Sequence, residues 1–209
     1  MLQRASNVKT LTLMCDESPS DPLEYTGWKL CSFNRRLTSY QSPDDFLPPS
    51  LGLRRKLEVG TAFMLSYYEH GLCRWSLQGQ GPQCQWDTTR TAGILLWEGD
   101  LKDLPKGYDK REEWAESMLE TYTCWCNGEV YGYSIEEDGV QGDSCFGFYG
   151  NDLDYMAEQV RGLINGDEVE IEGDAKDLAS YHDFTSKPDK TKPQAKVIRR
   201  AGAYWEVSP

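Results

Sequence analysis

The sequence feature that most constrains the fold is the stretch from Leu119 to Gly150, which is dense in aromatic residues and holds three of the seven cysteines. Two turn signals divide this stretch: the Asn127-Gly128 dipeptide and the acidic, glycine-containing run from Glu136 to Gly142. Asn-Gly between apolar runs is typical of a tight β-hairpin turn. The pattern therefore predicts antiparallel strands over residues 122–126, 129–135 and 144–149.

The rest of the chain alternates short apolar strands with a few amphipathic helices. Further strands are predicted over residues 11–15, 28–33, 60–69, 72–77, 92–97 and 168–172, and residues 197–207 are compatible with one more. Helices are predicted near residues 43–57, 110–122 and 152–163, the second of them capped by Asp109. This order predicts an α+β fold, an antiparallel sheet built of hairpins with three or four helices packed on it.

With 209 residues, the chain is long enough for one sizeable core or two small ones. We expect a single α+β domain over residues 1–184, with two sub-domains meeting near residues 98–108 as the alternative. Residues 185–209 begin with a Lys/Pro-rich segment without an apolar stripe and are expected to form a linker and a C-terminal tail. The sequence contains neither a signal peptide nor a run of ~20 apolar residues, which predicts a soluble, intracellular protein without a membrane partner.

The net charge of −12 is unevenly distributed along the chain. Residues 98–177 contain 22 acidic and 6 basic side chains, a net charge of −16, whereas residues 1–97 have a net charge of +1. An acidic block of this size repels nucleic acid and suits a basic partner surface, although it is equally consistent with a solubilising face. If it binds a partner, the expected contact residues are Glu112, Glu113, Glu116, Glu120, Glu136, Glu137 and Asp138.

A second interpretation places nucleic-acid binding in the N-terminal half of the chain. Basic residues interleaved with aromatic ones are typical of surfaces that bind single strands. The candidate residues are Arg35, Arg36, Arg54, Arg55 and Arg74. Most of the neighbouring aromatic residues lie in predicted strands, where a role in the core is the simpler explanation.

The cysteines allow a third interpretation, a zinc site or an enzyme. His70 and Cys73 form an H-x-x-C pair that would need ligands from Cys84, Cys124 or Cys126, but the chain has no C-x-x-C pair. Reduced thiols that pack as small apolar groups explain the same residues. The sequence also lacks a phosphate-binding loop, a nucleophile elbow and a metalloprotease motif, so we expect neither catalysis nor a cofactor.

Four segments of the chain resemble an uncharacterised family of proteins from bacteriophages and other mobile elements. They are the acidic and proline-rich segment 16–24, the C-x-x-x-R-R segment 31–36, the C-Q-W-D segment 84–87 with Gly93-Ile94, and residues 122–150 with the sequences GEVYG and DSCFGFYG. The chain departs from the family pattern at Asn34, where the family tends to have His, and at Phe146, where it tends to have Trp. The resemblance spans about residues 10–155 and does not include the tail.

This resemblance implies an accessory protein acting in the cytoplasm of a bacterial host. Accessory phage proteins without catalytic motifs often bind and disable a host defence system. Combined with the acidic block, the resemblance leads to the expectation of an inhibitor that mimics nucleic acid. Its partner would be a nuclease, a CRISPR effector or another nucleoprotein complex with a basic channel.

Overall fold

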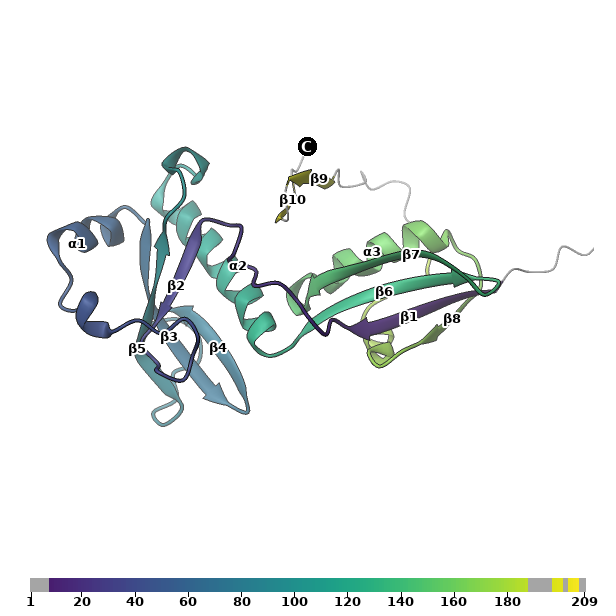
Figure 1. The fold of residues 1–209 in the computed structure, drawn as a ribbon, viewed down its shortest axis with the longest axis horizontal. Helices are drawn as coiled ribbons and strands as arrows, with labels where there is room; N and C mark the ends of the chain where they lie inside the picture. Colours follow the sequence, from purple (N-terminus) through teal and green to yellow (C-terminus); the bar gives the residue numbers. More distant parts are fainter. Residues whose placement is uncertain (1–7, 188–196, 201–202, 207–209) are drawn as a thin grey trace, which may run out of the picture. The chain divides into compact units, whose positions relative to one another are not determined.

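The computed structural model describes residues 8–187, 197–200 and 203–206, which show that the chain is an α+β protein with two compact units (Figure 1). Unit 1 contains the described residues 8–20, 128–187, 197–200 and 204–206, and unit 2 contains residues 21–127 and 203. Each unit has a four-stranded sheet of its own, in place of the one sheet that was expected. The expected meeting point near residues 98–108 lies inside unit 2.

Unit 1 is a four-stranded sheet covered by one helix. Its elements are β1 (Lys9–Cys15), β6 (Val130–Glu137), β7 (Val140–Tyr149), the 3-10 turn η3 (Gly150–Asp152), α3 (Leu153–Ile164), β8 (Val169–Glu172) and the 3-10 turn η4 (Lys176–Ser180). The strand order is β7–β6–β1–β8, with β1 antiparallel to β6 and parallel to β8.

Unit 2 is inserted between two neighbouring strands of unit 1. Cys15 at the end of β1 is paired with Tyr131 at the start of β6, and the Asp16 backbone N–H donates to the Val130 carbonyl over 2.8 Å. The chain therefore leaves β1 and returns to β6 at adjacent positions. Unit 2 takes the place that a short turn would have in an ordinary hairpin.

Alternation along β1 determines which face of this sheet is buried. Leu11 and Leu13 are fully buried and pack with an apolar stripe of α3. Residues from η4 and the buried Phe184 complete the same core. Thr10, Thr12 and Met14 alternate with the two leucines and point to the opposite face.

Unit 2 is an antiparallel sheet between helices. Its elements are β2 (Trp28–Ser32), the 3-10 turn η1 (Pro43–Asp45), α1 (Leu51–Glu58), β3 (Ala62–His70), β4 (Leu72–Leu77), β5 (Thr88–Trp97), the 3-10 turn η2 (Leu101–Asp103) and α2 (Tyr108–Cys126). The strand order is β2–β5–β3–β4, with α2 on one side of the sheet and α1 on the other (Figure 1).

The core of unit 2 on the α2 side is built from tryptophans. The ring of Trp28 lies 5.2 Å from that of Trp97 and 5.8 Å from that of Trp114, measured between centroids. Trp114 therefore packs against the core. Large aromatic pairs of this kind add to the stabilisation from buried apolar area.

The strand predicted over residues 122–126 is wrong, because these residues form the last turns of α2. Tyr122 continues the buried stripe of Ala115 and Leu119 at helical spacing, and Trp125 packs beside it. The following Asn-Gly pair ends this helix: the Asn127 N–H bonds to the Thr123 carbonyl, and Gly128 takes φ +72°. A left-handed glycine after the last helical turn is a common helix terminator.

The predicted capping of α2 by Asp109 is also wrong. The helix begins at Tyr108, with Gly107 as its N-cap in a conformation with φ +99°. Asp109 instead lies within the first turn, where its negative charge complements the helix dipole. The other two predicted helices correspond to η1 with α1 and to α3.

The C-terminal segment forms strands β9 (Val197–Arg200) and β10 (Ala203–Glu206), which pair with each other. Most of the predicted Lys/Pro linker, residues 188–196, lies outside the described residues. Among the described helices, none combines the length and the apolar composition needed to cross a bilayer.

Candidate functional site

The two units differ strongly in charge. Residues 8–20 and 128–187 of unit 1 contain 17 acidic and 4 basic side chains, a net charge of −13, whereas residues 21–127 of unit 2 contain 15 and 12, a net charge of −3. With only four basic side chains, this part of unit 1 cannot neutralise most of its carboxylates by ion pairs of its own. The acidic character of the chain therefore belongs to unit 1 rather than to a continuous block of sequence.

Unit 1 also has one sheet face that its helical segments do not cover. Both α3 and η4 pack on the face formed by Leu11, Leu13 and their neighbours. The opposite face, named here the open face, alternates with these buried positions on all four strands. It consists of Thr10, Thr12, Met14, Gly132, Ser134, Glu136, Ser144, Phe146, Glu170 and Glu172.

Strand pairing arranges the acidic side chains of the open face in transverse rows. Thr10 is paired with Glu136 of β6 on one side and with Glu170 of β8 on the other. Thr12 is likewise flanked by Ser134 and Glu172, and its hydroxyl donates to a Glu172 carboxylate oxygen over 3.1 Å. The exposed carboxylates of Glu136 and Glu170 thus flank Thr10, and the carboxylate of Glu172 lies beside Thr12 in the next row.

The end of the open face near the chain's exit to unit 2 is apolar. Phe146 of β7 lies directly over Gly132, where an added Cβ would come within 2.3 Å of the phenyl ring. Gly132 therefore permits the close approach of an aromatic ring from the neighbouring strand. Phe146 remains 45% exposed, and Met14 follows in the adjacent strand. The open face thus combines carboxylates, hydroxyls and one aromatic ring.

The seven acidic residues predicted to contact a partner are divided between the two units. Glu112, Glu113, Glu116 and Glu120 lie on α2 of unit 2, whereas Glu136, Glu137 and Asp138 lie at the β6–β7 turn of unit 1. On α2, Glu113 and Glu120 are exposed and the other two are half-buried. The three residues at the turn are all exposed, and Glu136 also belongs to the open face.

Glu112 has a structural partner within α2. Its side chain bonds to Tyr108 in the first turn of the helix. Burial raises the pKa of Tyr108, and the Glu112 carboxylate raises it further. Glu112 is therefore part of the helix start and is the least suited of the four to a contact with another protein.

The basic residues of the nucleic-acid interpretation are all exposed on unit 2. Arg54 and Arg55 lie on α1, Arg74 lies on β4, and Arg35 and Arg36 follow β2. The guanidinium of Arg35 lies 5.9 Å from the centre of the Tyr40 ring, a cation–π distance. In the described part of the chain, none of the five forms an ion pair within 4.0 Å.

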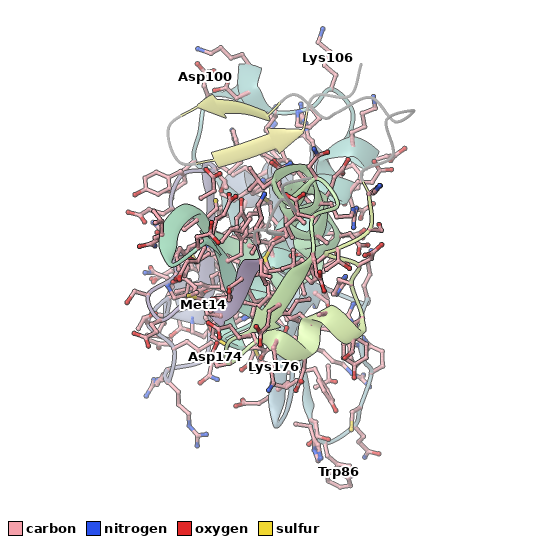
Figure 2. The ribbon with its side chains drawn as sticks, turned by 90° about the vertical axis from the view of Figure 1, so that its right-hand side faces the viewer. Met14, Trp86, Asp100, Lys106, Asp174 and Lys176 are labelled. Carbon is pink, nitrogen blue, oxygen red and sulfur yellow. The ribbon has the colours of Figure 1, made fainter. Side chains whose placement is uncertain are left out.

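One exposed aromatic residue of unit 2 was not among the predicted contact residues. Trp86 is 86% exposed, and Figure 2 shows its side chain projecting from the end of the loop between β4 and β5. The signal was present in the turn-rich sequence GQGPQCQW, because a tryptophan in such a loop has little core to enter. A fully exposed tryptophan is typical of a binding hot spot.

The proposed metal ligands separate into three places. Asp87 accepts a hydrogen bond from the Cys84 thiol over 3.2 Å and lies 3.5 Å from the His70 ring nitrogen Nδ1. Cys73 and Cys126 are hydrogen-bonded to each other, and Cys124 is buried in the helix. Within residues 8–187, 197–200 and 203–206, no three His, Cys, Asp or Glu side chains are arranged to hold a metal ion.

Comparisons of the chain with protein-family models, with curated proteins and with solved structures gave no match. The function must therefore be argued from the charge, exposure and contacts of its own residues.

Proposed function

We propose that this chain is a non-enzymatic accessory protein of a mobile element, and that it inhibits a host defence protein by occupying a basic, nucleic-acid-binding channel. The observation that carries the proposal is the charge of unit 1, 17 acidic against 4 basic side chains in residues 8–20 and 128–187. A surface of this charge attracts a basic channel and speeds the encounter with it.

The open face of unit 1 is the best candidate for the contact surface. Its rows of carboxylates are held on strands, so their spacing is fixed by the sheet rather than by long side chains on a loop. Successive outward residues of a strand, such as Glu170 and Glu172, are separated by roughly 6.6 Å along the strand. The threonine and serine hydroxyls between the carboxylates can accept hydrogen bonds from lysine and arginine side chains.

The chemical class of partner follows from the same groups. Arginine and lysine side chains that normally hold phosphates would bind the carboxylates, since both anions accept charge-assisted hydrogen bonds. Phe146 adds an apolar contact at one end of the face. The resemblance to proteins of bacteriophages and mobile elements makes a nuclease or CRISPR effector of the bacterial host the expected partner, in the cytoplasm of that host.

The test compares charge reversals in the two units. Cells that express the chain are challenged with DNA that their restriction or CRISPR system destroys, and the survival of the DNA is measured. Glu136→Lys with Glu170→Lys should reduce protection by about tenfold or more, because two carboxylates of one row are reversed. Glu113→Lys with Glu120→Lys makes the same change of charge on α2 and should leave protection unchanged.

The opposite pattern, loss of protection only in the α2 variant, would move the contact to that helix. Protection that survives both double reversals would contradict an acidic contact surface altogether. Each variant is compared with the unmodified chain by circular dichroism, so that a loss of fold is not mistaken for a loss of contact.

A second candidate function, direct nucleic-acid binding, rests on the exposed arginines of unit 2 and on Trp86. Bases of a single strand stack on aromatic rings while basic side chains hold the backbone. Retardation of single-stranded DNA or RNA, with an affinity that falls steeply as salt is raised, would support it. Trp86→Ala should then weaken binding, whereas reversal of Glu136 and Glu170 should not.

A further inference from the structure

Cys73 of β4 and Cys126, the last residue of α2, are brought together although they are 53 residues apart in the sequence. The neighbouring Asn127 holds them in place. Its side-chain oxygen accepts from the Cys73 N–H over 2.9 Å, and its amide nitrogen donates to the Cys73 carbonyl over 3.1 Å. Asn127 thus pairs with β4 as a further strand would, and the two thiols meet beside it.

The contact between the helix end and the strand extends beyond Asn127. The Trp75 N–H donates to the Thr123 hydroxyl over 3.1 Å, one helical turn before Asn127. The rings of Trp75 and Tyr122 lie 6.5 Å apart. These contacts fix the backbone on both sides of the thiol pair, so the two sulfur atoms are held close by the fold rather than by chance encounters.

The two thiols are not equivalent. A hydrogen bond from the Cys126 thiol lowers the pKa of Cys73, and a second one from the Tyr67 hydroxyl lowers it further, against the opposing effect of burial. The same bond to Cys73 raises the pKa of Cys126. Cys73 is therefore the cysteine of the pair that forms a thiolate more readily. It is half-buried, whereas Cys126 is exposed to solvent.

We infer that Cys73 and Cys126 form a reversible disulfide when the protein meets a peroxide. The Cys73 thiolate attacks one peroxide oxygen, the O–O bond breaks, and Cys73 becomes a sulfenic acid while the other oxygen leaves as hydroxide and is protonated to water. The Cys126 sulfur then attacks the Cys73 sulfur. The S–S bond forms, the S–O bond breaks, and the Cys126 proton leaves with the oxygen as a second water. Two thiols and one peroxide thus give one disulfide and two waters.

This site is independent of the proposed partner-binding function, and its position suggests what it controls. Asn127 is the last residue of unit 2 before the chain enters unit 1 at Gly128. A disulfide here would tie the end of α2 covalently to the edge strand β4. It would close a loop of 53 residues and stabilise unit 2 mainly by restricting its unfolded state.

The test uses the full chain treated with hydrogen peroxide. The number of free thiols should fall by two from the initial seven, the mass should fall by two hydrogen atoms, and peptide mapping should find one cross-link between Cys73 and Cys126. A dithiol reductant should restore all seven thiols. The melting temperature of unit 2 should rise by roughly 10 °C in the oxidised form.

Variants separate the two chemical steps. Cys126→Ser should stop the reaction at the Cys73 sulfenic acid, which a 1,3-diketone probe labels, and Cys73→Ser should prevent the loss of thiols. Cys145→Ser, a change in unit 1, serves as the matched control and should leave the cross-link unchanged. A cross-link between other cysteines in the unmodified chain, or overoxidation of Cys73 without any cross-link, would overturn the inference even if one variant fails to fold.

Discussion

The two units protect their sheets in different ways. In unit 2 both faces of the sheet are packed, and Thr123 of α2 and the following Asn127 satisfy outward-facing N–H groups of the edge strand β4. In unit 1 the helical segments cover one face, and the open face and most of β7 are exposed. Both sheet faces are thus covered in the near-neutral unit 2, whereas one sheet face is exposed in the strongly acidic unit 1. This contrast is why we place partner binding in unit 1.

The largest effect is expected from removing unit 2. Because Asp16 and Val130 are already adjacent in the sheet, replacing residues 17–129 with an Asn-Gly turn should leave unit 1 folded. The shortened protein should retain the thermal transition of unit 1 and lose that of unit 2 completely. Circular dichroism during heating measures both, and a shortened chain without a cooperative transition would show that the units depend on each other.

Two glycines of unit 1, Gly173 and Gly162, should respond in opposite ways to substitution by alanine. Gly173 has φ +102°, and a Cβ at this position would come within 1.9 Å of the Leu13 carbonyl oxygen. Gly173→Ala should therefore destabilise unit 1 by roughly 2–3 kcal/mol. The free energy of unfolding in urea measures the loss, which should appear in the transition of unit 1 alone.

Gly162 is the matched control for this substitution. It lies on the exposed side of α3, and a Cβ there would meet nothing within 4 Å. Gly162→Ala should stabilise unit 1 by about 0.5–1 kcal/mol, since alanine favours the helix. If both substitutions change the free energy of unfolding in the same direction, the close approach of Gly173 to β1 does not determine the stability at this position.

Salt should affect the two units unequally. Between about 10 mM and about 1 M salt the Debye length falls from about 30 Å to about 3 Å, which screens repulsion between like charges. The melting temperature of unit 1 should rise by several degrees, because its residues 8–20 and 128–187 carry a net charge of −13. The nearly balanced unit 2 should change little and serves as the internal reference. An equal rise in both transitions would mean that salt acts by a general mechanism.

Much of the secondary structure could be predicted from the sequence because the signals are local. The alternation of Leu11 and Leu13 with polar residues indicated β1, and the EVEIE pattern indicated β8. The Asn127-Gly128 pair misled the prediction because the same dipeptide suits a hairpin turn and a helix end. The helical spacing of Trp114, Met118 and Tyr122 continued to Trp125, and packing against the sheet decided in favour of the helix.

The candidate site was harder to predict because it depends on pairing across the chain. Glu170 and Thr10 are 160 positions apart in the sequence. They face each other only because β8 runs parallel to β1. No local pattern specifies such a parallel neighbour. The insertion of unit 2 was hidden for the same reason, since the pairing of Cys15 with Tyr131 joins positions that are far apart in sequence.

Acid should reveal the smallest difference between the units, through one carboxyl group in each. The Ser186 hydroxyl and the backbone N–H groups of Ser186 and Thr185 bond to Asp183 of unit 1 and lower its pKa below 3.8. This group therefore stabilises unit 1 above pH 3.8, and its contribution is lost as the pH falls through the lowered pKa. Burial raises the pKa of Asp21 of unit 2, against a hydrogen bond from the Leu23 N–H. Its contribution is present below pH 3.8 and is lost as the pH rises through the raised pKa.

Two asparagine variants measure these opposite signs by thermal melting between pH 3 and pH 7. Asp183→Asn should slightly lower the midpoint of unit 1 at pH 7 and have less effect in acid, because protonation weakens the same bonds in the unmodified chain. Asp21→Asn should slightly raise the midpoint of unit 2 at pH 7, since its side-chain oxygen can still accept from Leu23 without a buried charge. Shifts of the same sign in both units would show that the hydrogen bond at Asp21 outweighs the cost of its burial.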